Sequence, residues 1–263
     1  ENTAVGYKSL YSNTTGYYNT AMGSQSLYFN SSGTSNTAVG YSALYYNTTG
    51  FSNVAVGSGA LYLNSTGNYN TAVGYDALRN NTAIDNSAFG FNALRANTTG
   101  TDNVAIGKNT LLANTTGNEN TSLGTASLYN ATTASFNTAL GSRALYRSTT
   151  GGSNVAIGHD AAYSGTTANN SVAIGRFAMR DITTGTGNVA VGSFALRGLT
   201  TGDSNSTFGE LRAGASNTAL GHYAMPALTT GNTNIAIGHR SGNTITTGSR
   251  NILIGDLAGN GTL

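Results

Sequence analysis

One pattern of seventeen residues recurs from one end of the chain to the other and limits what the chain can fold into. It reads N-[TV]-A-[VIL]-G-x-x-A-L-Y-x-N-T-T-G-x-x, and thirteen of the fifteen spacings between its anchor glycines are seventeen residues. The anchors are Gly6, Gly23, Gly40, Gly57, Gly74, Gly90, Gly107, Gly124, Gly141, Gly158, Gly175, Gly192, Gly209, Gly221, Gly238 and Gly255. A fixed short period is typical of a solenoid, in which each coil packs only against its neighbours. We therefore predict a single repeat domain over residues 1–263, of about fifteen coils.

The composition argues against several classes of function. Only 8% of the residues are charged, and the net charge of +2 is scattered, so no basic stripe predicts nucleic-acid binding. No apolar run approaches the roughly 18 residues of a membrane span. Acidic residues are sparse and the glycines are periodic rather than grouped in a phosphate loop, so we predict no enzyme and no cofactor. An enzyme built in a groove between subunits is the alternative that stays open.

Positions in a coil are numbered from the anchor glycine, and their residue types predict where each side chain points. Seventeen residues leave room for two short strands, at −4 to +1 and at +3 to +5, and Thr, Asn and Gly are poor helix formers. Position −1 is always large and apolar and position +4 is Leu in ten of sixteen repeats, so we expect both to point inward. Asn occupies position −4 in fifteen of sixteen repeats, which indicates a buried ladder between coils. The chain is thus predicted to be an all-β parallel β-solenoid.

Position −2 is Ala in thirteen of sixteen repeats and would face away from position −1. A small apolar ladder on an outer face predicts close packing against other chains, because a thin coil buries little apolar surface by itself. The alternative is that Ala is merely tolerated there. The interface residues expected on this basis are Ala4, Ala21, Ala38, Ala55, Ala72, Ala88, Ala105, Ala139, Ala156, Ala173, Ala190, Ala219 and Ala236.

Some repeats resemble a known family. The segment 170–175 reads N-S-V-A-I-G, the signature of YadA-like trimeric autotransporter adhesin heads, and 154–158 and 234–238 are close variants. The form N-T-A-V-G-Y-x-A-L is also similar to repeats of phage tail-fibre-type proteins. The resemblance implies a homotrimer of left-handed β-rolls, exposed on a cell surface or a virion and used for attachment. Seventeen-residue coils depart from that family, whose heads use about fourteen or fifteen residues per coil.

Position +5 carries an outward row of tyrosines and arginines. Its members are Tyr11, Tyr28, Tyr45, Tyr62, Arg79, Arg95, Tyr129, Tyr146, Tyr163, Arg180 and Arg197, with Leu112 between them. Tyr rings stack on sugar faces and Arg binds carboxylates, so one interpretation is a glycan-binding or partner-binding face. The other is that stacked tyrosines stabilise the sheet or cover a junction between protomers.

Three smaller groups of polar residues each have two interpretations. His159, His222 and His239 share position +1 and are either metal or anion ligands on a threefold axis or ordinary surface residues. Asp85, Asp102 and Glu119 share position −5 and either hold a cation or lie in exposed turns. Six asparagines at position +7 form N-x-[ST] sequons, which turn chemistry explains as well as glycosylation does. They are Asn13, Asn30, Asn47, Asn64, Asn97 and Asn114.

Three functions are consistent with these features. A structural and adhesive segment of an extracellular fibre fits the uninterrupted repeat, the low charge and the alanine ladder. A glycan-binding or receptor-binding module would use the Tyr and Arg row. An ice-binding solenoid is disfavoured because the repeat has adjacent threonines in a turn and no T-x-T array. We further expect a narrowed coil at 210–217, and a coil at 74–90 that loses one turn residue but keeps its strand register.

Overall fold

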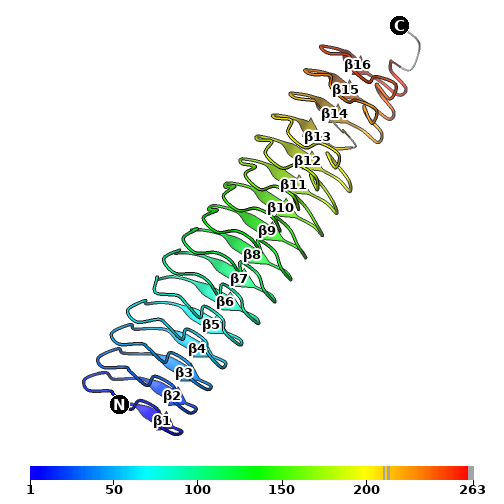
Figure 1. Cartoon of the computed structure of the whole chain (residues 1–263). Helices are drawn as coiled ribbons and strands as arrows, with labels where there is room; N and C mark the ends of the chain where they lie inside the picture. Colours follow the sequence, from blue (N-terminus) through cyan, green and yellow to red (C-terminus); the bar gives the residue numbers. More distant parts are fainter. Residues whose placement is uncertain (210, 212–213, 260–263) are drawn as a thin grey trace. The chain divides into compact units, whose positions relative to one another are not determined.

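The computed structural model describes residues 1–209, 211 and 214–259, and the strands follow one another once per coil (Figure 1). The described residues form sixteen short strands and no helix, in about fifteen turns of about seventeen residues. The prediction of an all-β parallel β-solenoid is therefore confirmed. The chain divides into two compact units, residues 1–135 and 136–263, which are built from the same coil and are described separately below.

The first unit contains eight parallel strands that pair in chain order. They are β1 Thr3–Val5, β2 Thr20–Met22, β3 Thr37–Val39, β4 Val54–Val56, β5 Thr71–Val73, β6 Ser87–Phe89, β7 Val104–Ile106 and β8 Thr121–Leu123. The sixteen-residue coil keeps its register as predicted, with Thr71 opposite Ser87 and Val73 opposite Phe89. Identical positions of successive coils therefore lie side by side.

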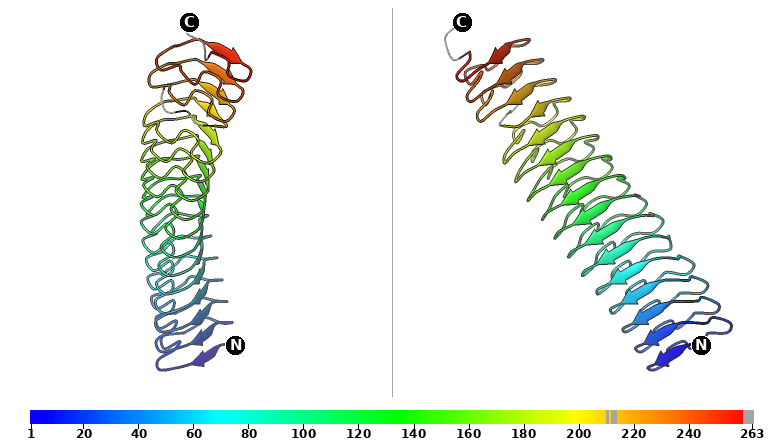
Figure 2. Two further views of the ribbon diagram at one scale, coloured as in Figure 1. Left: turned by 90° about the vertical axis from the view of Figure 1, so that its right-hand side faces the viewer. Right: turned by 180° about the vertical axis from the view of Figure 1, so that it is seen from behind.

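The second unit repeats this arrangement with eight more strands. They are β9 Thr138–Leu140, β10 Val155–Ile157, β11 Val172–Ile174, β12 Val189–Val191, β13 Ser206–Thr207, β14 Thr218–Leu220, β15 Ile235–Ile237 and β16 Ile252–Ile254. Across the twelve-residue spacing, Ser206 still pairs with Thr218. The narrowing expected at 210–217 falls on residues 210, 212 and 213, which lie outside the described residues. In both views of Figure 2 the strands of each unit form one side of its coils and loops form the other.

Each coil contains one strand instead of the two that the sequence predicts. The strand covers positions −3 to −1, and the segment after the anchor glycine is a series of turns. In the Gly40 coil, Ser42 and Leu44 have φ angles of 54° and 52°, which exclude an extended strand at 43–45. Hydrogen bonds to neighbouring coils compensate for this strained conformation, because the Leu44 N–H donates to the Ala60 carbonyl at 3.0 Å.

The two faces of the strand are reversed relative to the prediction. The alanines at position −2, such as Ala38 and Ala55, are fully buried inside the coil, and the residues at −1, such as Val39, lie on the outer face. Ala4, in the first coil, is the exposed exception. In most coils the core consists of Ala at −2, Ala at +3 and Leu at +4, so the large side chain at +4 is matched by a small one at −2. The proposed interface at Ala21, Ala38, Ala55, Ala72, Ala88, Ala105, Ala139, Ala156, Ala173, Ala190, Ala219 and Ala236 is therefore wrong, because these side chains are not on the surface.

The asparagines at position −4 form the buried ladder that the sequence predicts. The Asn36 Oδ1 accepts the backbone N–H of Asn53 at 3.0 Å and its side-chain amide at 3.1 Å. The Asn53 amide also donates to the Gly67 carbonyl at 2.8 Å. Each side chain thus pairs backbone groups that a tight corner leaves without partners. Ser171 interrupts the ladder in the second unit, where its hydroxyl accepts the Asn188 N–H at 3.3 Å.

The sequon asparagines form a second ladder, in the first unit. The Asn47 amide donates to the Asn30 Oδ1 at 2.7 Å and to the Gly50 carbonyl at 3.0 Å, and both residues are fully buried. Turn chemistry is therefore the interpretation that the structure supports at Asn30, Asn47, Asn64, Asn97 and Asn114, since a buried amide nitrogen offers no room for a glycan.

The anchor glycines are required by close approach between coils. Gly40 has a φ of 133°, and a Cβ atom there would lie 2.7 Å from the carbonyl group of Gly57 in the next coil. No L side chain fits this conformation or this space. The stacking distance of the coils thus explains the glycine at Gly40 and at the other anchors that approach the next coil as closely.

Candidate functional site

The row at position +5 of the first unit begins with a stack of four tyrosines. The rings of Tyr28 and Tyr45 lie 5.1 Å apart at an interplanar angle of 19°, and those of Tyr45 and Tyr62 lie 5.2 Å apart at 12°. Tyr11 continues the stack at 5.2 Å from Tyr28. Because the ring faces cover one another, they are not free to stack on a sugar. The row therefore stabilises the coils in the way the second interpretation proposed.

A second aromatic row strengthens this stack. Phe29 and Tyr46, at position +6, are stacked 5.3 Å apart and meet the first row edge to face, with Tyr45 and Tyr46 at 4.8 Å. Burial raises the pKa of the Tyr45 phenol above its ordinary value, and the negative charge that ionised Tyr46 would carry raises it further. Burial and Tyr46 raise the pKa of Tyr62 in the same way. Both phenols therefore stay neutral hydrogen-bonding groups over a wider pH range.

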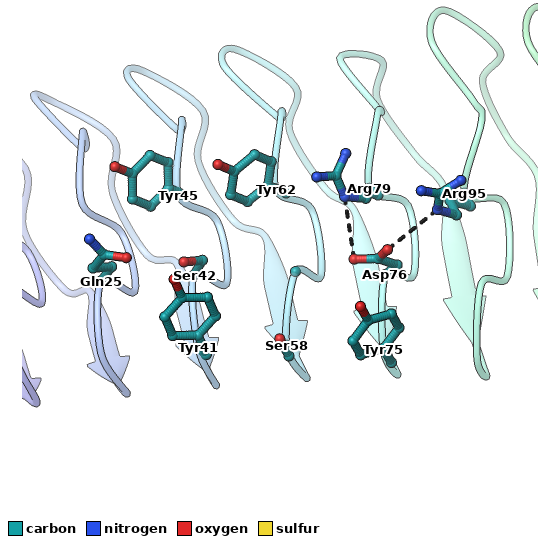
Figure 3. A pocket seen from close by; sticks show the side chains of 11 residues that line it. Gln25, Tyr41, Ser42, Tyr45, Ser58, Tyr62, Tyr75, Asp76, Arg79 and Arg95 are labelled. Atoms are coloured by element: carbon teal, nitrogen blue, oxygen red, sulfur yellow. Dashed lines mark hydrogen bonds and ion pairs between the residues drawn. The ribbon is translucent and has the colours of Figure 1, made fainter.

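The tyrosine stack ends in a charged cluster. The guanidinium of Arg79 covers the remaining face of Tyr62, with its central carbon 4.8 Å from the ring centre. Arg79 and Arg95 both direct Nε at the carboxylate of Asp76, at 3.4 and 3.3 Å (Figure 3). The Asp76 side chain is only 13% exposed. Two guanidinium groups against one carboxylate leave a net positive charge at the rim.

An open groove runs between the row at +5 and the residues at +1 and +2. It has a volume of about 570 Å3 and is lined by Gln25, Tyr41, Ser42, Tyr45, Ser58, Gly59, Tyr62, Tyr75, Asp76, Arg79 and Arg95. Two exposed rings, Tyr41 and Tyr75, flank the small residue Ser58 (Figure 3). Gly59, the next residue in the chain, also lines the groove. The groove thus combines aromatic walls, hydroxyl and amide groups, and one net positive charge.

The second unit carries a related but different cluster. Tyr146 and Tyr163 stack at 5.1 Å, and Arg180 lies 5.8 Å from the Tyr163 ring. The buried carboxylate here is Asp160, which Arg143 binds at 2.8 Å through both Nε and a terminal nitrogen. Arg197 lies over Phe194 at 5.1 Å. Arg143 therefore uses two of its nitrogens to bind Asp160, whereas Arg79 and Arg95 each bind Asp76 through Nε.

The remaining candidate residues lie apart from this groove. His222 and His239 stack at 5.7 Å, and His239 Nδ1 is 2.9 Å from Asp256 Oδ1. His159 lies 3.7 Å from Asp160. Asp85, Asp102 and Glu119 are exposed and have φ angles between 54° and 58°, so they occupy left-handed turn positions. Within the described residues, no three His, Cys, Asp or Glu side chains come together in a way that could hold a metal ion.

An outward apolar face on the strands is the feature that sequence reasoning assigned to the wrong side. In the first unit, Met22, Ile106 and Leu123 at position −1 are 45%, 40% and 46% exposed. In the second unit, Ile174 and Leu220 are 36% and 44% exposed. The invariably large apolar residue at −1 was the available signal, since a strand with apolar residues on both faces is typical of a sheet covered on both sides.

Comparison of the chain with protein-family models, with curated proteins and with solved structures gave no match. The described part of the chain contains no helix with the length and apolar character needed to cross a membrane.

Proposed function

We propose that this chain is a structural and adhesive segment of an extracellular fibre, in which three copies pack side by side. The observation that carries the proposal is the exposed apolar row at position −1 of the strands, which includes Met22, Ile106 and Leu123. Contiguous apolar surface of this kind marks an interaction site in soluble proteins. A repeating surface fits a partner with the same repeat, and another copy of this chain is such a partner.

Two further observations support a fibre. The ladder of buried asparagine at position −4 links successive coils within each unit, which suits a stiff spacer. The resemblance of 170–175 to trimeric adhesin heads points to the same assembly and to a location on a cell surface or a virion. The alanine ladder no longer contributes, because it is buried within each coil.

Light scattering coupled to size exclusion tests the assembly. The full chain should elute with about three times the chain mass of 26.7 kDa. Ile106→Lys places a charge on the strand face and should reduce the mass to that of one chain. Thr116→Lys, in an exposed turn of the same coil, is the matched control and should leave the trimer intact. A monomer of the unaltered chain at micromolar concentration would refute the proposal.

A second function, a glycan-binding module of tail-fibre type, is favoured by the groove between Tyr41 and Arg95. The two functions are compatible, because the groove lies among the residues that follow the anchor glycines while the apolar row lies on the strands. Ice binding gains no such support. The first turn threonine uses its hydroxyl internally, as Thr48 does in donating to the Ser65 carbonyl at 3.0 Å.

A further inference from the structure

The groove of the first unit has a gap in the row of aromatic residues at position +1. Position +1 is Tyr41, Ser58 and Tyr75 in three successive coils, so one ring is missing between two exposed rings. The rings that do lie in neighbouring coils stack, as Tyr75 and Phe91 do at 5.5 Å. Two coils correspond to about 10 Å at a strand spacing near 4.8 Å, which leaves about 5 Å between each tyrosine and a ring placed midway.

The residues at the floor and rim of the gap favour a ligand whose ring carries polar groups over an apolar ring. Gly59 contributes no side chain to the floor, while Ser42, Ser58 and Gln25 place hydroxyl and amide groups along the rim. A sugar has C–H groups on its ring faces and hydroxyls at its edge, so it matches tyrosine walls and a polar rim together.

The end of the groove selects a negative charge. Arg79 and Arg95 each bind Asp76 through Nε, and among the described residues nothing pairs with their terminal nitrogens. Paired guanidinium nitrogens match the two oxygens of a carboxylate. Asp76 does not repel such a group overall, because two arginines neutralise its single charge.

We propose that this groove binds a sugar that carries a carboxylate, with the sugar ring between Tyr41 and Tyr75. The carboxylate then lies against the terminal nitrogens of Arg79 and Arg95. This inference rests on the proposed adhesive function, since it names the chemistry of what the fibre attaches to: an acidic surface glycan.

Calorimetric titration of the full chain tests the proposal with three oligosaccharides of equal length. The first is built of hexuronic acids, the second is the same chain with its carboxyl groups reduced to hydroxymethyl groups, and the third has no carboxyl groups and carries its negative charge as sulfate esters. The uronate should bind, and both other ligands should bind at least about tenfold more weakly. Equal binding of the reduced or the sulfated ligand would overturn the assignment of a carboxylate.

Two variants localise the binding. Ser58→Tyr fills the gap with the residue found at this position in both adjacent coils, so it should fold, and it should abolish uronate binding. Arg95→Gln should weaken binding about tenfold and leave Asp76 paired with Arg79. Thr125→Tyr makes the same change at position +1 outside the groove and should have no effect.

Unchanged binding by Ser58→Tyr would refute the groove as the site. The mass of each variant, measured by light scattering, separates this inference from the proposed assembly. If uronate binding fails while the unaltered chain is a trimer, only the inference about the groove falls.

Discussion

Position +7 is asparagine in every coil of the first unit except the last, which has Ala131, and a large aliphatic residue in most coils of the second unit. In the Gly40 coil, the Gly50 carbonyl accepts the amides of both Asn36 and Asn47, at 2.8 and 3.0 Å. In the Gly192 coil, the Gly202 carbonyl accepts the Asn188 amide at 2.8 Å, and Leu199 stands where the Gly40 coil has its second asparagine. Ile182 and Leu228 occupy equivalent places and are also buried.

The fold depends on the asparagine ladder at position −4 and not on the ladder at position +7. The ladder at −4 is present in both units. Its asparagine amide donates to the glycine carbonyl of the turn whether position +7 is asparagine, as at Gly50, or leucine, as at Gly202. The ladder at +7 is replaceable, because a net hydrogen bond contributes about 0.5–1.5 kcal/mol and a fully buried aliphatic side chain about 1.5–3 kcal/mol. A corner can therefore be closed by polar pairing or by apolar packing, provided that neighbouring coils use the same device.

Exchanging the asparagine and the aliphatic residue at position +7 should give the largest change in the free energy of unfolding. Asn47→Leu removes the donor to Asn30 Oδ1 and the acceptor of the Asn64 amide, at 2.7 and 3.2 Å. Ile182→Asn buries an amide oxygen between Gly165 and Leu199, where the position +7 residues offer no amide donor. Each variant should lower the free energy of unfolding by about 2–3 kcal/mol, because a buried polar group loses its partner. Chemical denaturation followed by circular dichroism measures the change.

The matched control for that exchange is Ile182→Leu, which keeps both the volume and the apolar character. It should cost less than about 1.5 kcal/mol. If Ile182→Asn costs no more than Ile182→Leu, the corner tolerates an unpaired amide and the distinction between the two devices is wrong.

A smaller effect of opposite sign is expected where the +7 ladder ends. Asn114 donates to Asn97 Oδ1 at 2.8 Å, but its own buried Oδ1 has no partner, because the next coil has Ala131. Ala131→Asn should supply the missing donor and raise the free energy of unfolding by about 1 kcal/mol. The denaturation midpoint measures this gain.

Ala113→Asn introduces the same side chain at position +6, which is half-buried and lies outside the ladder. It should give no increase in the midpoint. A midpoint for Ala131→Asn that does not exceed that of Ala113→Asn would mean that the orphan oxygen of Asn114 costs nothing measurable.

The smallest expected effect is a loss of stability at alkaline pH, caused by the tyrosine stack of the first unit. Burial and Tyr46 raise the pKa of Tyr45 and Tyr62 in the folded chain. Above about pH 10 the unfolded chain loses these protons first, so stability is fully present below that pH and declines as pH rises through the folded values. The free energy of unfolding, measured by chemical denaturation at a series of alkaline pH values, should therefore fall as the pH rises above about 10.

Tyr45→Phe removes one of the two titrating groups and should make that alkaline decline shallower. Tyr17→Phe, at an exposed position outside the stack, should leave the decline unchanged. An identical decline in both variants would show that other groups cause it.

The sequence predicted the repeat-level features and missed those that depend on backbone conformation. The period, the parallel pairing, the asparagine ladder at −4 and the glycine anchors follow from residue types that recur at fixed spacing. The turns at +2 and +4 were missed because leucines such as Leu44 rarely adopt left-handed φ angles, and only contacts with neighbouring coils hold them there.

The candidate site was predicted in its members but not in its arrangement. The row at +5 identified Tyr45, Tyr62, Arg79 and Arg95, yet the ring faces are used for stacking, and the groove depends on Ser58 and Asp76 as well. A usable signal was present at position +1, where a small residue stands between two tyrosines. Its meaning required knowing that positions +1 and +5 flank one groove.

By itself, the sequence determined that this chain forms stacked coils of seventeen residues, because identical side chains at identical spacing satisfy one another only in register. The tertiary structure alone decided which face is inside. On a strand of three residues, Ala38 and Val39 alternate equally well in either sense, so periodicity cannot choose. The choice follows from packing, since Leu44 and Ala43 fill the interior of the coil and leave room for a small side chain such as that of Ala38 opposite them.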